Sequence, residues 1–123
     1  MRRSVRHYLL PVGVAIGLWR WRPVRRVEVA GDSMVPVLLP GDRLLVLRPA
    51  PLRVGDVVAV SDPRMPARTM VKRVAGWGPE GVTVLGDNPA ASTDSRALGP
   101  VPRAAVVGRA VYRYLPDSRR GLL

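Results

Sequence analysis

The chain has 123 residues, enough for one domain with a modest hydrophobic core and too few for a second. Its apolar fraction of 47% excludes wholesale disorder, and the absence of cysteine excludes disulfides, thiol catalysis and cysteine-bound metals. The single histidine, His7, lies in a basic N-terminal segment, a poor place for the base of a Ser-His-Asp triad. Dense turn signals from 12 glycines and 13 prolines favour a mostly β architecture of short strands.

The formal net charge of +11 is concentrated near the N-terminus, because residues 1–26 contain many arginines and no acidic residue. Such a segment suits an anionic membrane surface or a nucleic acid about equally well. Arginine so dominates the basic residues that Lys72 is the sole lysine. Arginine cannot lose its proton in a protein, whereas a buried lysine can, so Lys72 marks either a place where neutrality is needed or a chance survivor.

Residues 1–25 form a basic and apolar N-terminal segment. Its apolar run, residues 8–19, is shorter than the ~20 residues that a membrane-spanning helix needs. We expect a short helix here that dips into or lies on a membrane, with a packed core helix as the alternative. The catalytic core is expected over residues 26–116, followed by a frayed basic tail at 117–123.

Alternating and apolar runs predict strands at 26–30, 43–48, 57–60, 69–75, 82–85 and 105–114. Proline and glycine in the sequence Leu39-Pro40-Gly41-Asp42 predict a type II turn. In the strand at 69–75, alternation places Met70, Lys72 and Val74 on one face.

A serine becomes a useful nucleophile only when a base removes its proton, and a neutral lysine can be that base. An exposed lysine has a pKa near ~10.4, which burial can lower by up to ~3–5 units. Met70 and Val74 offer Lys72 an apolar wall, and Ser33 follows a strand and a Gly-Asp turn. On residue chemistry alone, Ser33 fits a solvated turn residue equally well.

Four blocks of sequence resemble the signal peptidase I family, in the family's order and over roughly residues 27–114. They are GDSMVPVLLPGD at 31–42, VGDVV at 54–58, VKRVAG at 71–76 and GDNPAASTDSR at 86–96, with GPVP at 99–102 continuing the last. One such block arises easily by chance, but four in order do not.

The resemblance implies a mostly β fold of twisted antiparallel sheets with a short N-terminal helix. It also implies a serine endopeptidase in which Ser33 attacks the scissile carbonyl and Lys72 is the general base. The backbone N–H of Ser33 would then be one donor of the oxyanion hole. For other positions the resemblance implies supporting roles: Ser92 orients the lysine, and Asp94 and Arg96 brace the site, with a turn residue of the scaffold as the equal alternative for each of these two. Met34 and Leu38 are expected to line the substrate groove, with core packing as an equally good explanation for Leu38.

Three departures from the family pattern concern the site. Gly31 stands where some members have a hydroxyl residue that gives a second oxyanion contact, and Val37 replaces the usual threonine. The segment after Lys72 reads GWGPEG, without the family's Pro-Gly-Asp. Because few residues separate Lys72 from Gly86, no inserted subdomain fits there, and we expect a minimal catalytic core.

The short length, the weak anchor and the block at 86–96 make the chain look most similar to the maturation proteases of nickel-type superoxide dismutase. Removal of signal peptides from exported proteins is the alternative substrate reading. The resemblance implies a precursor's N-terminal leader as substrate, a membrane-associated monomer with a cytoplasmic location as alternative, and no cofactor, metal or nucleic acid.

Two functions of other classes fit parts of the sequence. Self-cleaving repressors share the Ser-Lys fold, but they carry a DNA-binding domain for which there is no room before residue 27. A basic nucleic-acid-binding β domain fits the charge, but such domains interleave aromatic and basic residues, and this chain has no phenylalanine.

Overall fold

The computed structural model describes residues 24–48 and 51–123. The expected N-terminal helix and membrane anchor therefore lie mostly outside the described residues. Within the described part, the fold is mostly β, as the sequence predicted, with little helix.

Seven strands form one antiparallel sheet in the order β1-β2-β6-β3-β4-β5, with β7 added to β6. The strands are β1 (Val24–Glu28), β2 (Arg43–Leu47), β3 (Val57–Asp62), β4 (Met65–Gly78), β5 (Gly81–Leu85), β6 (Val106–Leu115) and β7 (Gly121–Leu122). One short α-helix and three 3₁₀ turns complete the described fold: η1 (Pro89–Ala91), α2 (Ser95–Leu98), η2 (Arg103–Ala105) and η3 (Asp117–Arg119).

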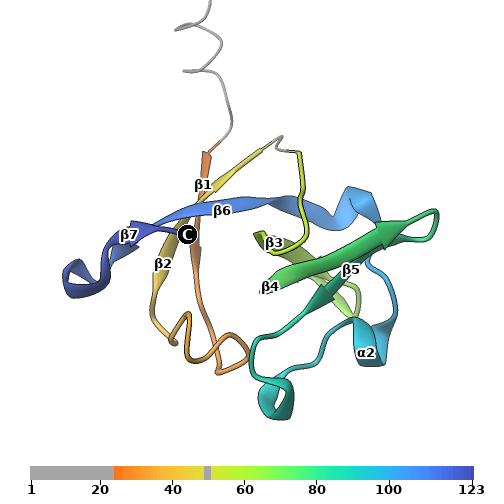
Figure 1. The fold of residues 1–123 in the computed structure, drawn as a ribbon, viewed down its shortest axis with the longest axis horizontal. Coiled ribbons are helices and arrows are strands. Elements are labelled where there is room, and N and C mark those ends of the chain that lie inside the picture. The colour runs from red at the N-terminus through yellow and green to blue at the C-terminus, as the bar shows by residue number, and fades with distance from the viewer. Residues whose placement is uncertain (1–23, 49–50) are drawn as a thin grey trace, which may run out of the picture.

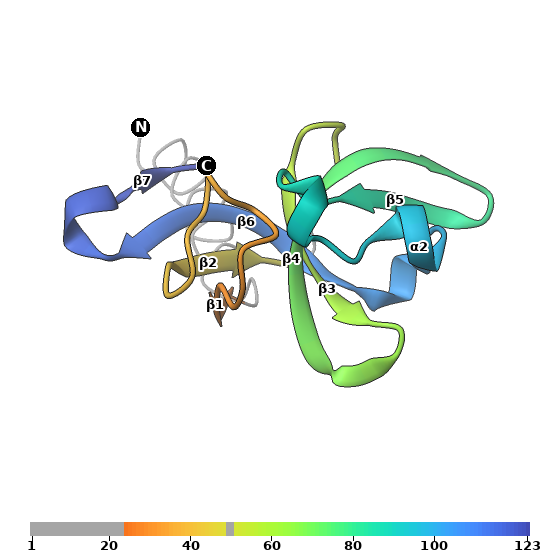
Figure 2. The ribbon, with the colours of Figure 1, turned by 90° about the horizontal axis from the view of Figure 1, so that it is seen from below.

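Strand β6 joins two lobes of the molecule. Figure 2 shows β1, β2 and β7 on one side and β3, β4, β5 and α2 on the other, with β6 running through both (Figures 1 and 2). The register explains this arrangement, because Val106 to Arg109 pair with β3 and Arg109 to Leu115 pair with β2. One continuous strand therefore belongs to both lobes of the twisted sheet.

The central strand β3 is buried on both faces and separates two hydrophobic clusters. Val57 and Ala59 pack with the residues of β2 and the β1–β2 loop, whereas Val58 and Val60 pack with β4 and β5. A continuous apolar run, here VVAV, is what a strand needs when both faces are covered.

The loop between β1 and β2 ends in the predicted type II turn. The backbone N–H of Asp42 donates to the carbonyl of Leu39 at 3.0 Å, and Gly41 has φ of +89°, which glycine adopts readily. The buried carboxylate of Asp42 also accepts from the backbone N–H of Leu39 at 2.9 Å. This turn closes the long loop that carries Ser33.

The C-terminal residues pack on the sheet, whereas the sequence suggested a frayed tail. β7 pairs with β6, and Arg119 of η3 donates to the buried carboxylate of Asp42 at 2.8 Å. Arg113 of β6 donates to the same carboxylate at 3.3 Å. The tail is thereby fastened to the loop that carries Ser33, because a buried carboxylate requires such partners.

Candidate active site

Lys72 lies on β4 with only 4% of its surface exposed. Its neighbours on the same face, Met70 and Val74, are buried as the alternation predicted, at 8% and 1% exposure. Burial lowers the pKa of Lys72 below its ordinary value of 10.5, and the charge of Asp94 opposes this less strongly. The structure therefore favours the neutral amine more than water does.

A hydrogen-bond chain leads from Lys72 to Asp94. Lys72 Nζ donates to Ser92 Oγ at 2.9 Å, and Ser92 Oγ donates to Asp94 Oδ2 at 2.7 Å. Because the single hydroxyl proton of Ser92 is directed at Asp94, its oxygen accepts from Lys72. This series of hydrogen bonds fixes the direction of one N–H bond of Lys72.

Asp94 is 1% exposed, and its carboxylate accepts several hydrogen bonds. The backbone N–H of Gly86 donates to it at 2.8 Å, and Arg96 donates through its backbone N–H at 3.1 Å and through Nε at 3.0 Å. Burial raises the pKa of Asp94, but the hydrogen bonds from Arg96, Gly86 and Ser92 outweigh it and hold this pKa well below its usual range. The acceptor of the Ser92 proton is thus a carboxylate at neutral pH.

Ser33 lies half-buried in the loop between β1 and β2, and Asn88 ties that loop to the segment after β5. The backbone N–H of Asn88 donates to the carbonyl of Ser33 at 2.8 Å, and its side-chain amide donates to the carbonyl of Asp32 at 3.1 Å. Among residues 24–48 and 51–123, the backbone N–H of Ser33 has no hydrogen-bond acceptor. That N–H is therefore free to bind an oxyanion.

Gly86 marks a close approach between Ser33 and Ser92. A Cβ atom at residue 86 would lie 2.2 Å from Ser92 Oγ and 2.7 Å from the carbonyl oxygen of Ser33. Only glycine fits at this distance, so its missing side chain lets both serines approach the same side of its backbone.

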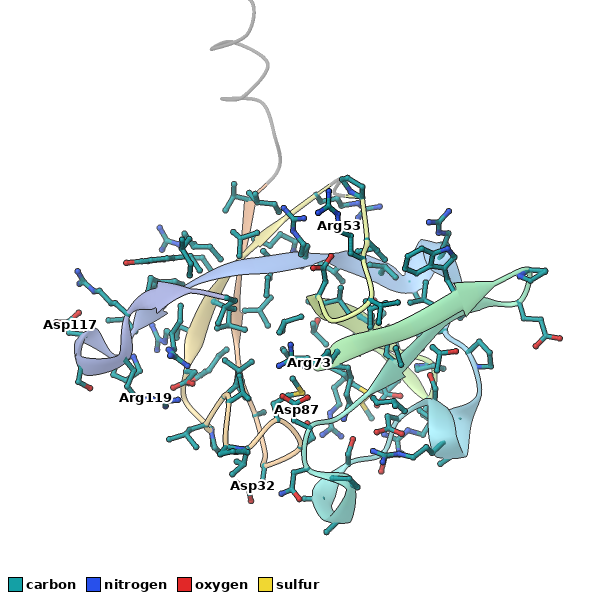
Figure 3. All side chains as sticks on the ribbon, viewed as in Figure 1. Asp32, Arg53, Arg73, Asp87, Asp117 and Arg119 are labelled. Atoms are coloured by element: carbon teal, nitrogen blue, oxygen red, sulfur yellow. The ribbon has the colours of Figure 1, made fainter. Side chains whose placement is uncertain are left out.

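Arg73 and Asp87 hold the same segment from the other face of β4. Arg73 donates to the Asp87 carboxylate through Nε at 2.9 Å and Nη2 at 2.8 Å, and the two side chains point toward each other in Figure 3. Arg73 also donates to the carbonyl of Gly55 at 2.7 Å. Such a bidentate pair fixes orientation as well as distance.

Ser33 and Lys72 both line one cavity of about 220 Å³. Its other lining residues are Val29, Ala30, Gly31, Asp32, Arg64, Arg68, Thr69, Met70, Val71, Ala91 and Thr93. The hydrogen bond that the structure gives Lys72 Nζ is to Ser92, so the face of the amine turned to the cavity can receive a proton. The arrangement can activate a hydroxyl at Ser33 for attack on a carbonyl.

Met34 and Leu38, suggested for the substrate groove, lie in the core. Both are 0% exposed, pack with Val29 and Leu44, and are absent from the cavity lining. Side chains with no exposed surface do not contact a peptide at the surface, so in this structure they support the loop that carries Ser33. Their apolar character suits both roles, which is why sequence alone did not separate them.

Four further residues, Gly86, Asn88, Arg64 and Arg68, have contacts or positions at the site that the sequence does not predict. Gly86 and Asn88 lie in the block at 86–96, but a match in sequence does not show which segments they contact. The two arginines reach the cavity because the β3–β4 hairpin folds beside it, which no local pattern indicates.

Among the described residues, no helix is long and apolar enough to cross a membrane. No group of three or more histidine, cysteine, aspartate or glutamate side chains there is placed to hold a metal ion.

Comparison with known proteins gives a consistent family. The family model described as "Signal peptidase, peptidase S26" matches residues 1–84 and 79–115. The chain is 36% identical to the mitochondrial ATP-independent inner membrane protease subunit 1a of Arabidopsis thaliana, over 81% of this chain and 76% of that protein. It is 29% identical to signal peptidase I of Leptolyngbya laminosa, over 93% of this chain and 79% of that protein.

A third relative, mitochondrial inner membrane protease subunit 2 of Danio rerio, is 33% identical over 89% of this chain and 73% of its own length. The family match extends over most of the chain, including the segments that carry Ser33 and Lys72. This chain therefore belongs to the signal peptidase family, peptidase S26, and is a serine peptidase.

Proposed function

We propose that this protein removes N-terminal leaders from precursor proteins, with Ser33 as the nucleophile and neutral Lys72 as the general base. One observation carries the proposal. A buried lysine with a lowered pKa, hydrogen-bonded to Ser92, lines the same cavity as a serine whose backbone N–H has no acceptor among the described residues. That combination is the Ser-Lys variant of a catalytic triad.

The reaction proceeds by acyl transfer. Ser33 Oγ attacks the scissile carbonyl carbon while Lys72 Nζ accepts the hydroxyl proton, and the oxyanion that forms accepts a hydrogen bond from the Ser33 N–H. The C–N bond then breaks, and the Lys72 ammonium gives its proton to the leaving amine. Water hydrolyses the acyl ester in the same way, with Lys72 accepting the proton of the water and returning it to Ser33.

Ser92 and Asp94 act through Lys72. Because Ser92 accepts one N–H of the amine, the lone pair of neutral Lys72 cannot point at Ser92 and is left available to a hydroxyl in the cavity that Lys72 lines. The carboxylate of Asp94 accepts the hydroxyl proton of Ser92, so this proton does not point at Lys72. Both are positioning residues in this account, and Arg96 in turn holds Asp94.

General leader cleavage is the substrate reading that the relatives support better. One of the three is named signal peptidase I, two are named inner membrane protease subunits, and the family model is that of signal peptidase. The narrower reading, maturation of a nickel-type superoxide dismutase, rests on the short chain and on the block at 86–96. It is therefore the second candidate.

The site of action follows from the same relatives. Two of them are named inner membrane proteases, and the N-terminal segment of this chain is rich in arginine and apolar residues. We infer that the chain works at a membrane surface, where anionic lipids attract such segments. Its partner is the precursor protein, and no nucleic acid is required.

The test compares two precursors in one assay. Purified protein is incubated with a signal-peptide precursor and with a leader-bearing nickel superoxide dismutase precursor, and the new N-termini are sequenced. We expect the signal-peptide precursor to be cut by wild type and by Ser118→Ala, an exposed serine in η3, but not by Ser33→Ala or Lys72→Met. Exclusive cutting of the dismutase precursor would replace our first substrate choice by the second, and equal cutting by Ser33→Ala would overturn the mechanism.

A further inference from the structure

The hairpin between β3 and β4 places two arginines in the wall of the catalytic cavity. Arg64 lies in the turn between the two strands, and Arg68 lies on β4, the strand that also carries Lys72. Both side chains are exposed to solvent and both line the cavity that Ser33 and Lys72 share. A peptide that enters this cavity therefore passes two arginine side chains.

Asp62 holds the side chain of Arg64 in place by hydrogen bonds. The buried carboxylate of Asp62 accepts from Arg64 at three positions: the backbone N–H at 2.9 Å, Nε at 3.1 Å and Nη2 at 3.0 Å. These contacts fix the direction of the guanidinium and leave part of it exposed. The pKa of Asp62 is lowered chiefly by the side-chain hydrogen bond from Arg64, so this carboxylate stays charged.

Arg68 has no acidic partner within residues 24–48 and 51–123. The only acidic residue in the cavity lining is Asp32, which is exposed on the Ser33 loop. When Lys72 is neutral, the lining therefore carries two positive charges and one negative charge. The positive charges also reach the catalytic end of the cavity, since both arginines lower the pKa of Lys72.

We propose that Arg68, assisted by Arg64, binds an acidic side chain of the substrate within a few residues of the scissile bond. This inference rests on the proposed function, because it names a preference of the same site. An Asp or Glu of the precursor can accept two N–H donors from Arg68, which has none of its donors committed to a carboxylate of the described chain. The arginine wall thus selects substrates that place an acidic residue beside the cut.

The test uses pairs of leader peptides that differ only by Asp or Asn at one position, scanned across the residues on both sides of the cut. We expect wild type to cleave one Asp peptide about fivefold better, in kcat/KM at low salt, than its Asn partner. Arg68→Gln removes most of that ratio and Arg68→Glu inverts it. Arg103→Gln, an exposed arginine of η2 that does not line the cavity, keeps the wild-type ratio.

The ratio of kcat/KM between the Asp and Asn peptides separates charge recognition from changes in the pKa of Lys72. Loss of Arg68 also removes a charge that lowers the pKa of Lys72, but that change affects both peptides of a pair equally. A ratio near one at every position, or a ratio unchanged in Arg68→Gln, overturns the inference. So does an equal loss on both peptides together with weaker sedimentation on phosphatidylglycerol vesicles, which would assign Arg68 to membrane contact.

Failure of this inference is distinguishable from failure of the proposed function. Cleavage of the neutral Asn peptide by wild type, and its absence in Ser33→Ala, reports the mechanism independently of Arg68. If the Asn peptide is cut and the Asp preference is missing, the mechanism stands and only the arginine wall loses its role.

Discussion

Lys72 and Ser92, twenty residues apart in the chain, are joined by a hydrogen bond of 2.9 Å from Nζ to Oγ. Ser92 donates onward to Asp94, so the lysine is the donor and the serine oxygen the acceptor. In a buried amine with one N–H held in this way, the lone pair is restricted to the two remaining positions, both of which face away from Ser92. The catalytic account depends on that restriction as much as on the pKa of Lys72.

Ser92→Ala should lower kcat while leaving KM nearly unchanged. Without the acceptor, Lys72 Nζ loses its fixed position, and a misplacement on the order of 1 Å costs about 10²-fold in rate. Ser92→Thr keeps the hydroxyl and should retain most of the activity. If Ser92 had only a structural role, the Thr and Ala variants would be equally active when they are equally stable. Steady-state kinetics on a neutral leader peptide measure both; a wild-type kcat in Ser92→Ala would remove Ser92 from the account.

The activity of wild type should rise with pH along a single limb. Lys72 must be neutral to accept a proton, and its pKa is lowered by burial, so the midpoint of this limb falls below 10.5. The measurement is kcat/KM from pH 5 to 10.5 on a peptide without titratable side chains. A limb centred at or above 10.5 would mean that Lys72 is not desolvated in solution.

Lys72→Met should stabilise the fold while abolishing activity. In the native state the pKa of Lys72 lies below its unfolded value, so charging the lysine costs stability at every pH below the native pKa. That cost fades as pH rises through the native pKa and vanishes above 10.5. The gain in melting temperature of Lys72→Met over wild type should therefore be largest at neutral or acidic pH and shrink in alkali; a constant gain would contradict the lowered pKa.

Gly86→Ala should damage both folding and catalysis. The added methyl would lie 2.2 Å from Ser92 Oγ and 2.7 Å from the Ser33 carbonyl oxygen, forcing the two serines apart. Overpacking of this kind costs about 1–3 kcal/mol. Gly78→Ala is the matched control, because nothing lies within 4 Å of its Cβ position. The free energy of unfolding in urea and kcat are measured for both variants. A Gly86→Ala variant as active as Gly78→Ala would refute the close approach of Ser33 and Ser92 to Gly86.

Arg119→Ala should lower the free energy of unfolding by about 1.5 kcal/mol, since it removes a hydrogen bond to a charged, buried group. Asp42 keeps Arg113 as a partner, which limits the loss. Arg120→Ala, which removes an ion pair between two exposed side chains, should have little effect. Equal midpoints of urea unfolding for the two variants would show that the C-terminal residues do not anchor the Ser33 loop.

Strands and turns were largely readable from the sequence because their causes are local. Alternation placed Met70, Lys72 and Val74 on one face of β4, and Pro40-Gly41 specified the type II turn. Strand β7 was missed because two residues carry no periodic signal. It forms because Arg119 and the end of β6 bring the chain back to the sheet.

The site was readable only in part. The resemblance of the sequence blocks to the family indicated Ser33, Lys72 and Ser92, but burial of Met34 and Leu38 depends on how the long loop folds over the core. The need for glycine at residue 86 arises from a contact between segments more than fifty residues apart in sequence. The arginine wall likewise depends on the placement of a hairpin, which tertiary packing decides.

The most direct test of the central claim is to locate the acyl group formed during turnover. Wild type is mixed with the p-nitrophenyl ester of a leader peptide, quenched in acid within a second, digested and examined by mass spectrometry. The account predicts the acyl group on Ser33, with none in Ser33→Ala of unchanged circular dichroism. An acyl group on another residue, or equal acylation of Ser33→Ala, would contradict the assignment of Ser33 as the nucleophile.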